Sequence, residues 1–464
     1  MLFAALADLP GVIALVVSRA DSASEHIGEA LLDRGDWTER TDDTRPDADG
    51  GGTYYRTDGF SLRTFDDLHI YLDRPDAAFD DPDLLIVVSR HSGETGPLLT
   101  AHFTGNFGDA EYGGEAGRFA RACPNAASEA VAALDRHAPD GYEVGTECTH
   151  HGPTDVGVPS MFVELGSAEA QWEDPAGAEA VARAVLDLQG AAADRDKQVA
   201  GFGGGHYAPR FGRVVRETAW AVGHVAADWG LEAMGNPAAN RDVIRRAVET
   251  SATEYALVEG ERPGLRDTLA DLGYRVVTET WLRETSDHPI PVVEAVESRL
   301  DDVSEGLRFG TVVPNVADDD AADAIVVADL PTQLVDAAGG VDADATRAAV
   351  ADAAVAFETT EGGTRPRGRV ALAAADPAAA TDDLTEALAA VLRDAYDEVR
   401  REDGVVVART TAFDPAAART LGVPEGPAFG RLADGQAVEV GGERIDPEAV
   451  RTERVDRFPA ATPN

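Results

Sequence analysis

Two short histidine-containing segments carry the residues best suited to chemistry in this 464-residue sequence. The first is Thr149–Thr154 (Thr-His-His-Gly-Pro-Thr), and the second is Gly201–Arg210 (Gly-Phe-Gly-Gly-Gly-His-Tyr-Ala-Pro-Arg). Both segments follow apolar runs typical of strands. Imidazoles can bind a metal ion or transfer a proton near neutral pH, and glycines allow a substrate to approach the backbone closely. The pattern predicts a hydrolytic pocket that holds a metal ion or a polarised water beside an anionic substrate.

Strand geometry separates the two neighbouring histidines of the first segment. If Cys148–His150 continues the preceding strand, His150 and His151 point to opposite faces, and a turn at Gly152-Pro153 could bring His151 back. We expect one histidine to act as ligand or base and the other to support it through a hydrogen bond. The alternative is a polar turn with one buried structural histidine. Thr154 is a candidate substrate-binding residue.

The second segment predicts an anion-binding loop. The backbone amides of Gly203, Gly204 and Gly205 carry no side chains that would obstruct an oxyanion or a phosphate. His206 follows as a candidate catalytic residue, and Arg210 is a natural partner for a phosphate or carboxylate. The alternative is a flexible glycine loop without a ligand.

A third polar region, from Ser89 to Asn106, adds two histidines and a carboxylate. Glu94 is a candidate general base. Catalytic zinc uses three protein ligands and one open position. The candidate metal ligands are His91, His102, His150 and His206. Cys148 could be a nucleophile, but a buried structural thiol is the interpretation we favour.

The charge of the chain is extreme. There are 84 acidic and 40 basic side chains, which gives a formal charge of −44, and Lys197 is the only lysine. Such a surface is typical of a halophilic cytosol, where salt screens the repulsion between carboxylates. In molar salt only contact ion pairs persist, so the net charge neither supports nor excludes an RNA substrate.

The remaining composition points to an intracellular protein. Cys123 and Cys148 are the only cysteines, which is too few for a disulfide scaffold. The apolar run Val12–Val17 is far too short to span a membrane and has no basic segment before it. We expect a cytoplasmic protein without a membrane partner, and a monomer.

Apolar runs alternate with helical segments through the first part of the chain. Strands are predicted at 12–18, 84–89, 98–103, 142–149, 161–165, 199–202, 255–259 and 274–280. This pattern predicts an α/β fold with a mixed, largely parallel sheet covered by helices on both faces. In such sheets, sites form where strands end, which is where the histidine segments fall.

Composition changes near residue 288. All ten histidines lie at or before His288, and Pro289 and Pro291 interrupt regular structure there. We therefore predict a catalytic domain at 11–287 and an accessory domain at 288–464. The second domain is expected to be smaller, of the α/β or α+β class, with helices at 344–357 and 382–402.

Several segments taken in order resemble the archaeal and plant type of the D-aminoacyl-tRNA deacylase family. They are Val16–Ser24, Ser89–Glu94, Thr104–Asn106, Thr149–Thr154 and Gly203–Arg210, within residues 11 to 287. The resemblance implies a fold similar to peptidyl-tRNA hydrolase and purine nucleoside phosphorylase. It also implies one or two zinc ions, and hydrolysis of the ester that joins a D-amino acid to tRNA.

Two other functions are compatible with these residues. One is a metal-dependent hydrolase or phosphorylase of a small ester or nucleoside, and the other is a tRNA-binding protein without catalysis. The catalytic candidates are His150, His151, His206 and Glu94. The substrate-binding candidates are Gly203, Gly204, Gly205, Arg210 and Thr154.

Overall fold

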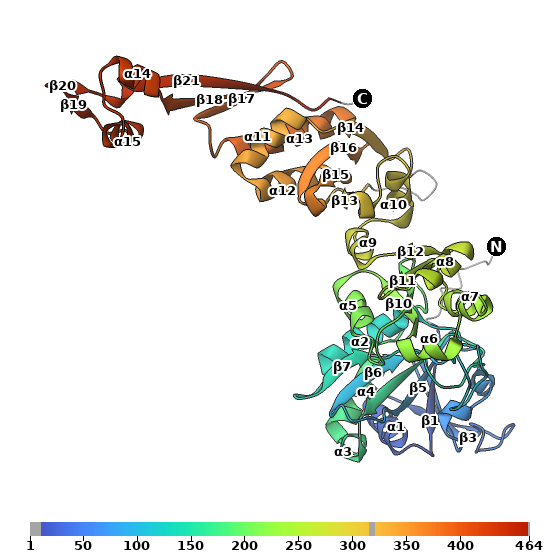
Figure 1. The fold of residues 1–464 in the computed structure, drawn as a ribbon. Coiled ribbons are helices and arrows are strands. Elements are labelled where there is room, and N and C mark those ends of the chain that lie inside the picture. The colour runs from blue at the N-terminus through green and yellow to red at the C-terminus, as the bar shows by residue number, and fades with distance from the viewer. Residues whose placement is uncertain (1–10, 315–320, 463–464) are drawn as a thin grey trace, which may run out of the picture. The chain divides into compact units, whose positions relative to one another are not determined.

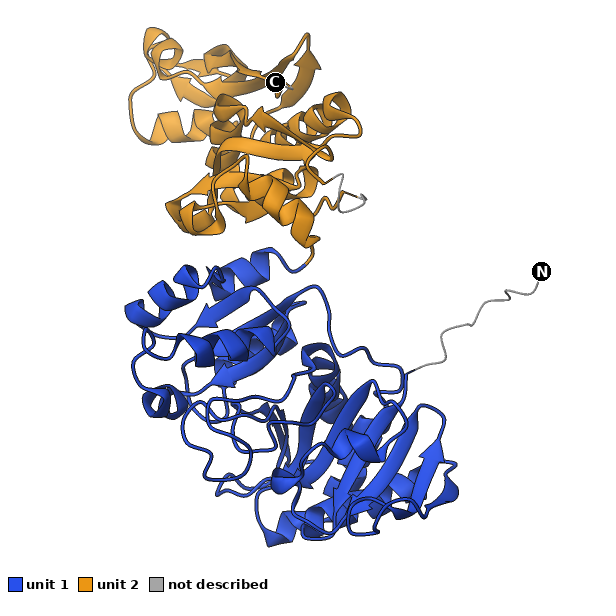
Figure 2. Cartoon of the chain, turned by 90° about the vertical axis from the view of Figure 1, so that its right-hand side faces the viewer, with its two compact units in different colours: residues 1–286 blue, residues 287–464 orange. Residues whose placement is uncertain are grey.

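The computed structural model describes residues 11–314 and 321–462. The chain forms two compact units, residues 1–286 and 287–464 (Figure 2). Helix α10 (Ile290–Glu297), which contains Pro291, is the first helix of the second unit. All histidines except His288 belong to the first unit.

The first unit contains an eight-stranded mixed sheet with the order β2-β3-β4-β1-β5-β8-β6-β7 (Figure 1). Neighbours in the central series β4-β1-β5-β8 are parallel, β6 is antiparallel to β8, and β2-β3-β4 are antiparallel. The strands are β1 (Ile13–Ser18), β2 (Thr38–Asp42), β3 (Gly52–Thr57), β4 (Phe60–Phe65), β5 (Leu84–Arg90), β6 (Leu98–His102), β7 (Glu143–Thr146) and β8 (Ser160–Gly166). The runs predicted at 12–18, 84–89 and 161–165 thus form three of the parallel strands at its centre.

Both faces of this sheet are buried, as continuous apolar strands require. In β1, Leu15 and Val17 face helices α1 (Ser22–Arg34), α2 (Pro124–His137) and α4 (Pro175–Leu186), whereas Ala14 and Val16 face the opposite core. The carboxylate of Asp21 caps α1 by accepting the N–H groups of Ala23 and Ser24. A one-turn helix, α3 (Glu169–Trp172), follows β8.

The remaining strands of the first unit form a second sheet, where the sequence predicted a single one. Its order is β10-β9-β11-β12, and all its strands are parallel. They are β9 (Gln198–Phe202), β10 (Ala221–Ala226), β11 (Tyr255–Val258) and β12 (Arg275–Val277), with helices α5 (Pro209–Glu217), α6 (Asp228–Met234), α7 (Arg241–Glu249), α8 (Pro263–Asp271) and α9 (Glu279–Glu284). The predicted fold class, α/β with mixed and largely parallel pairing, is confirmed.

The second unit is built from antiparallel sheets with helices. A four-stranded sheet has the order β13-β15-β16-β14, and smaller sheets pair β17-β18-β21 and β19-β20. Its strands are β13 (Arg308–Phe309), β14 (Ile325–Asp329), β15 (Ala356–Thr360), β16 (Arg365–Ala373), β17 (Glu398–Glu402), β18 (Val405–Phe413), β19 (Val438–Val440), β20 (Glu443–Ile445) and β21 (Arg451–Pro459). Its further helices are α11 (Thr332–Val341), α12 (Ala343–Ala353), α13 (Pro377–Leu392), α14 (Pro415–Thr420) and α15 (Pro427–Ala433).

Two predicted helices of this unit are too long at their C-terminal ends. Phe357 lies in β15, where it pairs with Val370 of β16, and Val399 lies in β17, opposite Ala408 of β18. Pairing with a distant strand decides these segments, which overrides the local helical preference of the alanine-rich sequence before them. No helix in the described ranges is both long and apolar enough to cross a membrane.

Candidate active site

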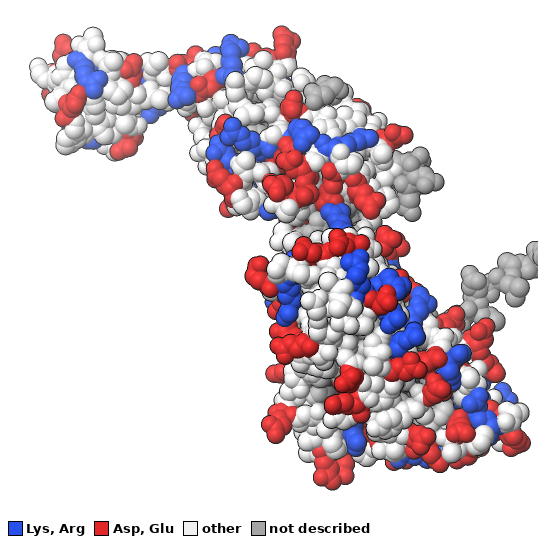
Figure 3. All heavy atoms as spheres, turned by 45° about the vertical axis from the view of Figure 1, so that its right-hand side comes forward, with Lys and Arg blue, Asp and Glu red and all other residues white. Residues whose placement is uncertain are grey.

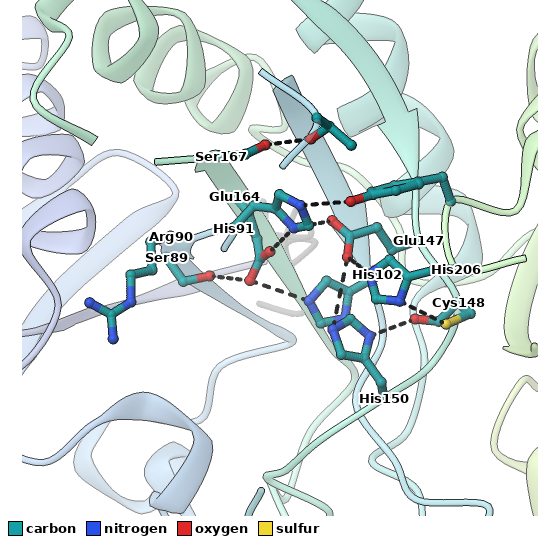
Figure 4. Close-up of polar contacts among 12 residues, drawn as sticks. Ser89, Arg90, His91, His102, Glu147, Cys148, His150, Glu164, Ser167 and His206 are labelled. Carbon is teal, nitrogen blue, oxygen red and sulfur yellow. Dashed lines mark hydrogen bonds and ion pairs between the residues drawn. The ribbon is translucent and has the colours of Figure 1, made fainter. Parts of the chain in front are cut away.

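The predicted histidines converge at the ends of their strands. His91 follows β5 directly, His102 is the last residue of β6, and His206 follows the glycine loop after β9. The segment after β7 joins the two sheets, since the Cys148 N–H donates to His206 O (2.7 Å) and the Thr149 N–H donates to Val225 O (2.8 Å). The close-up in Figure 4 shows the resulting cluster.

Strand β8 brings a buried carboxylate between two of these histidines. It pairs with β5 on one side and β6 on the other, so Glu164 stands opposite both Ser89 and Thr100. Residues two positions apart along a strand share a face, which puts His91 and His102 on the side of Glu164. Glu164 Oε1 lies 3.4 Å from His102 Nε2, and Oε2 lies 3.5 Å from His91 Nδ1. The Ser89 hydroxyl donates to Glu164 Oε1 (2.9 Å).

A second buried carboxylate, Glu147, links three imidazoles. Its Oε1 lies 3.0 Å from His91 Nδ1, and its Oε2 lies 2.8 Å from His206 Nε2 and 3.8 Å from His150 Nε2. The Glu147 side chain is fully buried, whereas that of His206 is 33% exposed. The cluster therefore opens to solvent on the side of His206.

Both histidines of the adjacent pair face the cluster. The ring centroid of His102 lies 4.4 Å from that of His150 and 4.9 Å from that of His151. His151 has a φ of +44°, in the left-handed region that non-glycine residues seldom adopt. This backbone conformation turns His151 to the same side as His150, which an extended strand could not do.

The surroundings shift the pKa values of these imidazoles in opposite directions. Burial lowers the pKa of His91, but its pairing with Glu147 and Glu164 outweighs burial and raises that pKa to about 10. Burial, assisted by His102, lowers the pKa of His151 to about 3 and holds the pKa of His150 well below its ordinary value. Around neutral pH, His91 is a cation and the His150-His151 pair is neutral, so acid and base roles are separated within one site.

Three imidazoles share a hydrogen-bonding pattern typical of metal ligands. The Nδ1 atoms of His102, His150 and His151 lie 3.1, 2.8 and 2.7 Å from backbone carbonyl oxygens. A carbonyl can only accept, so each Nδ1 carries a hydrogen and each Nε2 is the nitrogen left to bind an ion. Nitrogen atoms of these three residues lie within 4.8 Å of one another.

The cluster forms the wall of a pocket of about 820 Å³. His91, His150, His151 and His206 line it from the cluster, as does Glu164. This volume is within the range of pockets that bind small organic ligands.

The sequence of this chain is similar to that of known proteins. The sequence profile described as D-aminoacyl-tRNA deacylase matches residues 78–277. A D-aminoacyl-tRNA deacylase of Halorubrum lacusprofundi is 58% identical over 97% of both chains. The chain belongs to the D-aminoacyl-tRNA deacylase family.

Relatives of the family extend over both units. The D-aminoacyl-tRNA deacylase of Natronomonas pharaonis is 53% identical over 96% of this chain and 100% of its own. That of Methanococcoides burtonii is 29% identical over 94% of each chain. Since residues 287–464 are more than a third of the chain, these alignments include most of the second unit. A crystal structure of a conserved protein of unknown function, AF0625, matches with a TM-score of 0.53 and 28% identity over 59% of this chain and 97% of that one.

The glycine loop of this deacylase family member does not present three free amides. The Gly203 N–H donates to Ala226 O (2.7 Å), and the Gly204 N–H donates to Asp228 Oδ1 (2.7 Å). Arg210 also has an internal partner, because its Nε donates to Glu279 Oε2 (3.1 Å). Two of the three glycine amides and Arg210 therefore have acceptors within the protein, and the anion-binding role of Gly203, Gly204, Gly205 and Arg210 stays a prediction.

Two other predicted residues lie outside the cluster. Glu94 is exposed in the loop after β5, and its role as general base stays a prediction; the carboxylates within the cluster are the buried Glu147 and Glu164. The Thr154 hydroxyl accepts the Glu115 N–H (2.9 Å) and organises a neighbouring loop. Cys148 is buried beside His206, and burial raises the pKa of its thiol to about 12, which disfavours a thiolate nucleophile.

Sequence reasoning missed both carboxylates of the cluster. Glu164 interrupts Ser160–Gly166, a strand that is otherwise apolar or small and is buried throughout. A single charged residue within such a strand needs a buried partner, so it was a usable signal. Glu147 lies three residues before His150, and no apolar run around it indicated that its carboxylate is buried. His69 also lines the pocket and lies outside the segments that the sequence analysis singled out.

Proposed function

We propose that this protein hydrolyses the ester bond between a D-amino acid and the 3′ end of tRNA, which releases free tRNA. Membership in the family, whose relatives carry that name, supports the reaction. The observation that carries the chemistry is the buried cluster in which one cationic and two neutral imidazoles share a pocket with two carboxylates. A tRNA substrate makes the cytoplasm the expected location.

The donor set fits a zinc ion at His102, His150 and His151. These side chains offer three imidazole nitrogens, a kind of ligand that zinc prefers. The buried Nε2 of His102 makes no hydrogen bond, although Glu164 Oε1 lies 3.4 Å away. When bound there, zinc would lower the pKa of a coordinated water and so supply a nucleophile at neutral pH. Glu164 raises the pKa of His102 against the effect of burial, so an ion at Nε2 would compete with a proton for that nitrogen.

A second set of ligands lies beside the first. His91, Glu147 and His206 have ligand atoms within 4.8 Å of one another, and Cys148, His150 and His206 form an overlapping group. Metal stoichiometry therefore distinguishes a site for one ion from a site for two.

The chain's own residues provide charge stabilisation and proton transfer. His91 is held as a cation by two carboxylates and can stabilise the oxyanion that forms when water attacks the ester. His206 is the most open imidazole of the cluster, and its bond to Glu147 (2.8 Å) orients it for proton transfer to the leaving ribose oxygen.

The decisive experiment compares hydrolysis of D- and L-aminoacyl-tRNA in high salt, together with the metal content of the purified protein. We expect turnover of the D-substrate by the wild type and its loss in the His206→Ala variant with the fold retained. Full activity of that variant would contradict the proposed site. Equal hydrolysis of both enantiomers would contradict the proposed substrate.

A further inference from the structure

Exposed aromatic side chains gather at one place on this protein. Within residues 11–314 and 321–462, the exposed Phe, Tyr and Trp side chains are Tyr71 (59% exposed), Tyr112 (64%), Tyr207 (36%) and Trp229 (49%). Tyr71, Tyr112 and Trp229 line the active-site pocket, and the hydroxyl of Tyr207 lies 3.2 Å from His91 Nε2. Exposed aromatic residues grouped around one pocket mark a binding surface rather than random surface composition.

The backbone of the His-His-Gly-Pro segment holds the two tyrosines in place. The Gly152 N–H donates to Tyr112 O (2.9 Å), and a side chain on Gly152 would collide with the Gly113 backbone at 2.4 Å. Gly113 in turn packs against the carbonyl of Ile70, next to Tyr71. The residues that carry both rings are therefore fixed relative to His151, the neighbour of Gly152.

Helix α6, which carries Trp229, packs against the same loop. Trp229 is the second residue of α6, and Gly108 allows that helix to approach closely, since a Cβ on Gly108 would lie 2.7 Å from that of Ala233. The loop from Phe107 to Tyr112 thus connects α6 with the tyrosines. The backbone segments that carry the three rings are therefore packed against one another.

The charges around this pocket do not suit a phosphate clamp. Arg90 is the only lysine or arginine among the residues that line the pocket, and Figure 4 shows its side chain directed away from the imidazoles. Asp109 and Glu111 also line the pocket. On the face drawn in Figure 3, basic side chains lie among acidic ones. At high salt, phosphate contacts would contribute little in any case.

We propose that Tyr71, Tyr112 and Trp229 form a stacking platform for the unpaired bases at the 3′ end of the RNA substrate. The platform lies on the same pocket as His150 and His206, so stacked terminal nucleotides would carry the acylated ribose to the imidazole cluster. Stacking suits this chain because every base has an aromatic face, and such contacts do not depend on ionic attraction. This inference rests on the proposed function, since it assumes an RNA substrate.

The direct test measures binding without catalysis. The probe is an RNA oligonucleotide that ends in CCA and carries no amino acid. Its binding is compared with that of an oligonucleotide whose last three nucleotides are abasic, by fluorescence anisotropy in about 2 M KCl. We expect the wild type to bind the CCA probe more tightly. Each of Tyr71→Ala, Tyr112→Ala and Trp229→Ala should weaken that binding by about 5- to 150-fold, which corresponds to about 1–3 kcal/mol per stacked base.

Matched variants separate the ring from other effects. Tyr71→Phe and Tyr112→Phe keep the ring and should bind within about twofold of the wild type. Leu421→Ala removes a side chain of similar exposure (45%) from the second unit and should leave binding unchanged. Because the three aromatic side chains are 49–64% exposed, their truncation should not unfold the protein.

Kinetics separate failure of this inference from failure of the proposed function. With D-aminoacyl-tRNA, the alanine variants should raise KM and leave kcat nearly unchanged, and the salt dependence of kcat/KM should be shallow. Unchanged KM and unchanged probe affinity in all three alanine variants would overturn the platform while leaving the hydrolytic function intact. A change of oligomeric state in these variants instead of a change in RNA affinity would also overturn it, because the rings would then contact a second copy.

Discussion

The Nδ1 atom of His91 lies 3.0 Å from Oε1 of Glu147, and both side chains are buried. Glu164 lies on the other side of the same nitrogen, at 3.5 Å. Two buried carboxylates therefore share one imidazolium, in addition to the bonds of Glu147 to His206 and of Glu164 to Ser89. This arrangement keeps both carboxylates ionised and leaves a positive charge at the pocket wall, next to the neutral His150-His151 pair.

Loss of the Glu147 charge should impair catalysis without removing the fold. Glu147→Gln preserves the shape of the side chain, but the amide cannot help to keep His91 charged or orient His206 as the carboxylate does, so we expect kcat to fall by about 10²- to 10⁴-fold. Single-turnover hydrolysis of D-aminoacyl-tRNA in high salt measures this. The matched control is Glu94→Gln, at the exposed carboxylate, which should retain nearly full activity. A loss of activity in Glu94→Gln together with full activity in Glu147→Gln would contradict this prediction and support Glu94 as the general base.

Removal of a proposed zinc ligand should reduce metal content. His151→Ala takes away one of three nitrogen ligands, and we expect the variant to lose about 10- to 100-fold or more in zinc affinity. Elemental analysis after dialysis checks this, and a chelator should lower the melting temperature of the wild type more than that of the variant. His26→Ala, at a histidine bonded to Trp172 O outside the cluster, is the control. Equal zinc in all three proteins would exclude His151 as a ligand.

His224 should make stability depend on pH. Burial lowers its pKa to about 4, and the ring bonds Thr149 and Ala120. The unfolded chain takes up a proton at this residue near pH 6.5, whereas the folded chain does so only near pH 4. Stability from His224 is therefore complete above about pH 6.5, and about 3 kcal/mol at most is lost as pH falls toward 4.

The variant that tests this pH dependence is His224→Gln, which cannot titrate. Chemical denaturation at several pH values should show a smaller loss of unfolding free energy between pH 6.5 and 4 than in the wild type. His26→Gln should keep the wild-type slope. If His224→Gln kept that slope as well, other groups would be responsible for the acid sensitivity.

Two glycines of the predicted motifs should respond differently to alanine. A Cβ on Gly152 would lie 2.4 Å from the backbone of Gly113 and 2.6 Å from Ile70 O, so Gly152→Ala should destabilise the protein by about 1–3 kcal/mol and lower activity. Gly205→Ala meets nothing within 4 Å and should leave stability nearly unchanged. Thermal unfolding in high salt measures both. Equal effects would mean that close packing does not explain Gly152.

Much of the framework was predictable from local pattern. The runs at 84–89 and 161–165 are apolar apart from Ser89 and Glu164, so neither has a polar face and both were expected to become strands covered on both sides. Their ends then had to carry the polar segments, which is why the histidine motifs were correctly expected to follow strands. The family resemblance followed from the same residues.

The composition of the site depended on tertiary structure. Glu164 meets His91 and His102 only because β8 inserts between β5 and β6, and strand order is set by chain crossovers that local patterns do not encode. The strand β10, with Gly223 and His224 within it, was missed for a related reason: its burial comes from a second sheet. His151 joins the cluster through a left-handed backbone conformation that tertiary packing enforces.

The sequence by itself therefore determined the chemical inventory: the histidines, the glycines that allow close packing, the acidic surface and the strand-forming runs. Tertiary structure decided which carboxylates meet which imidazoles, and which aromatic rings stay exposed at the pocket. The physical reason is the distance along the sequence over which each kind of information acts. Local periodicity indicates burial and conformation over a few residues. Charge states and binding surfaces depend instead on groups that are far apart in the sequence, such as Glu147 and His206, which are separated by 59 residues.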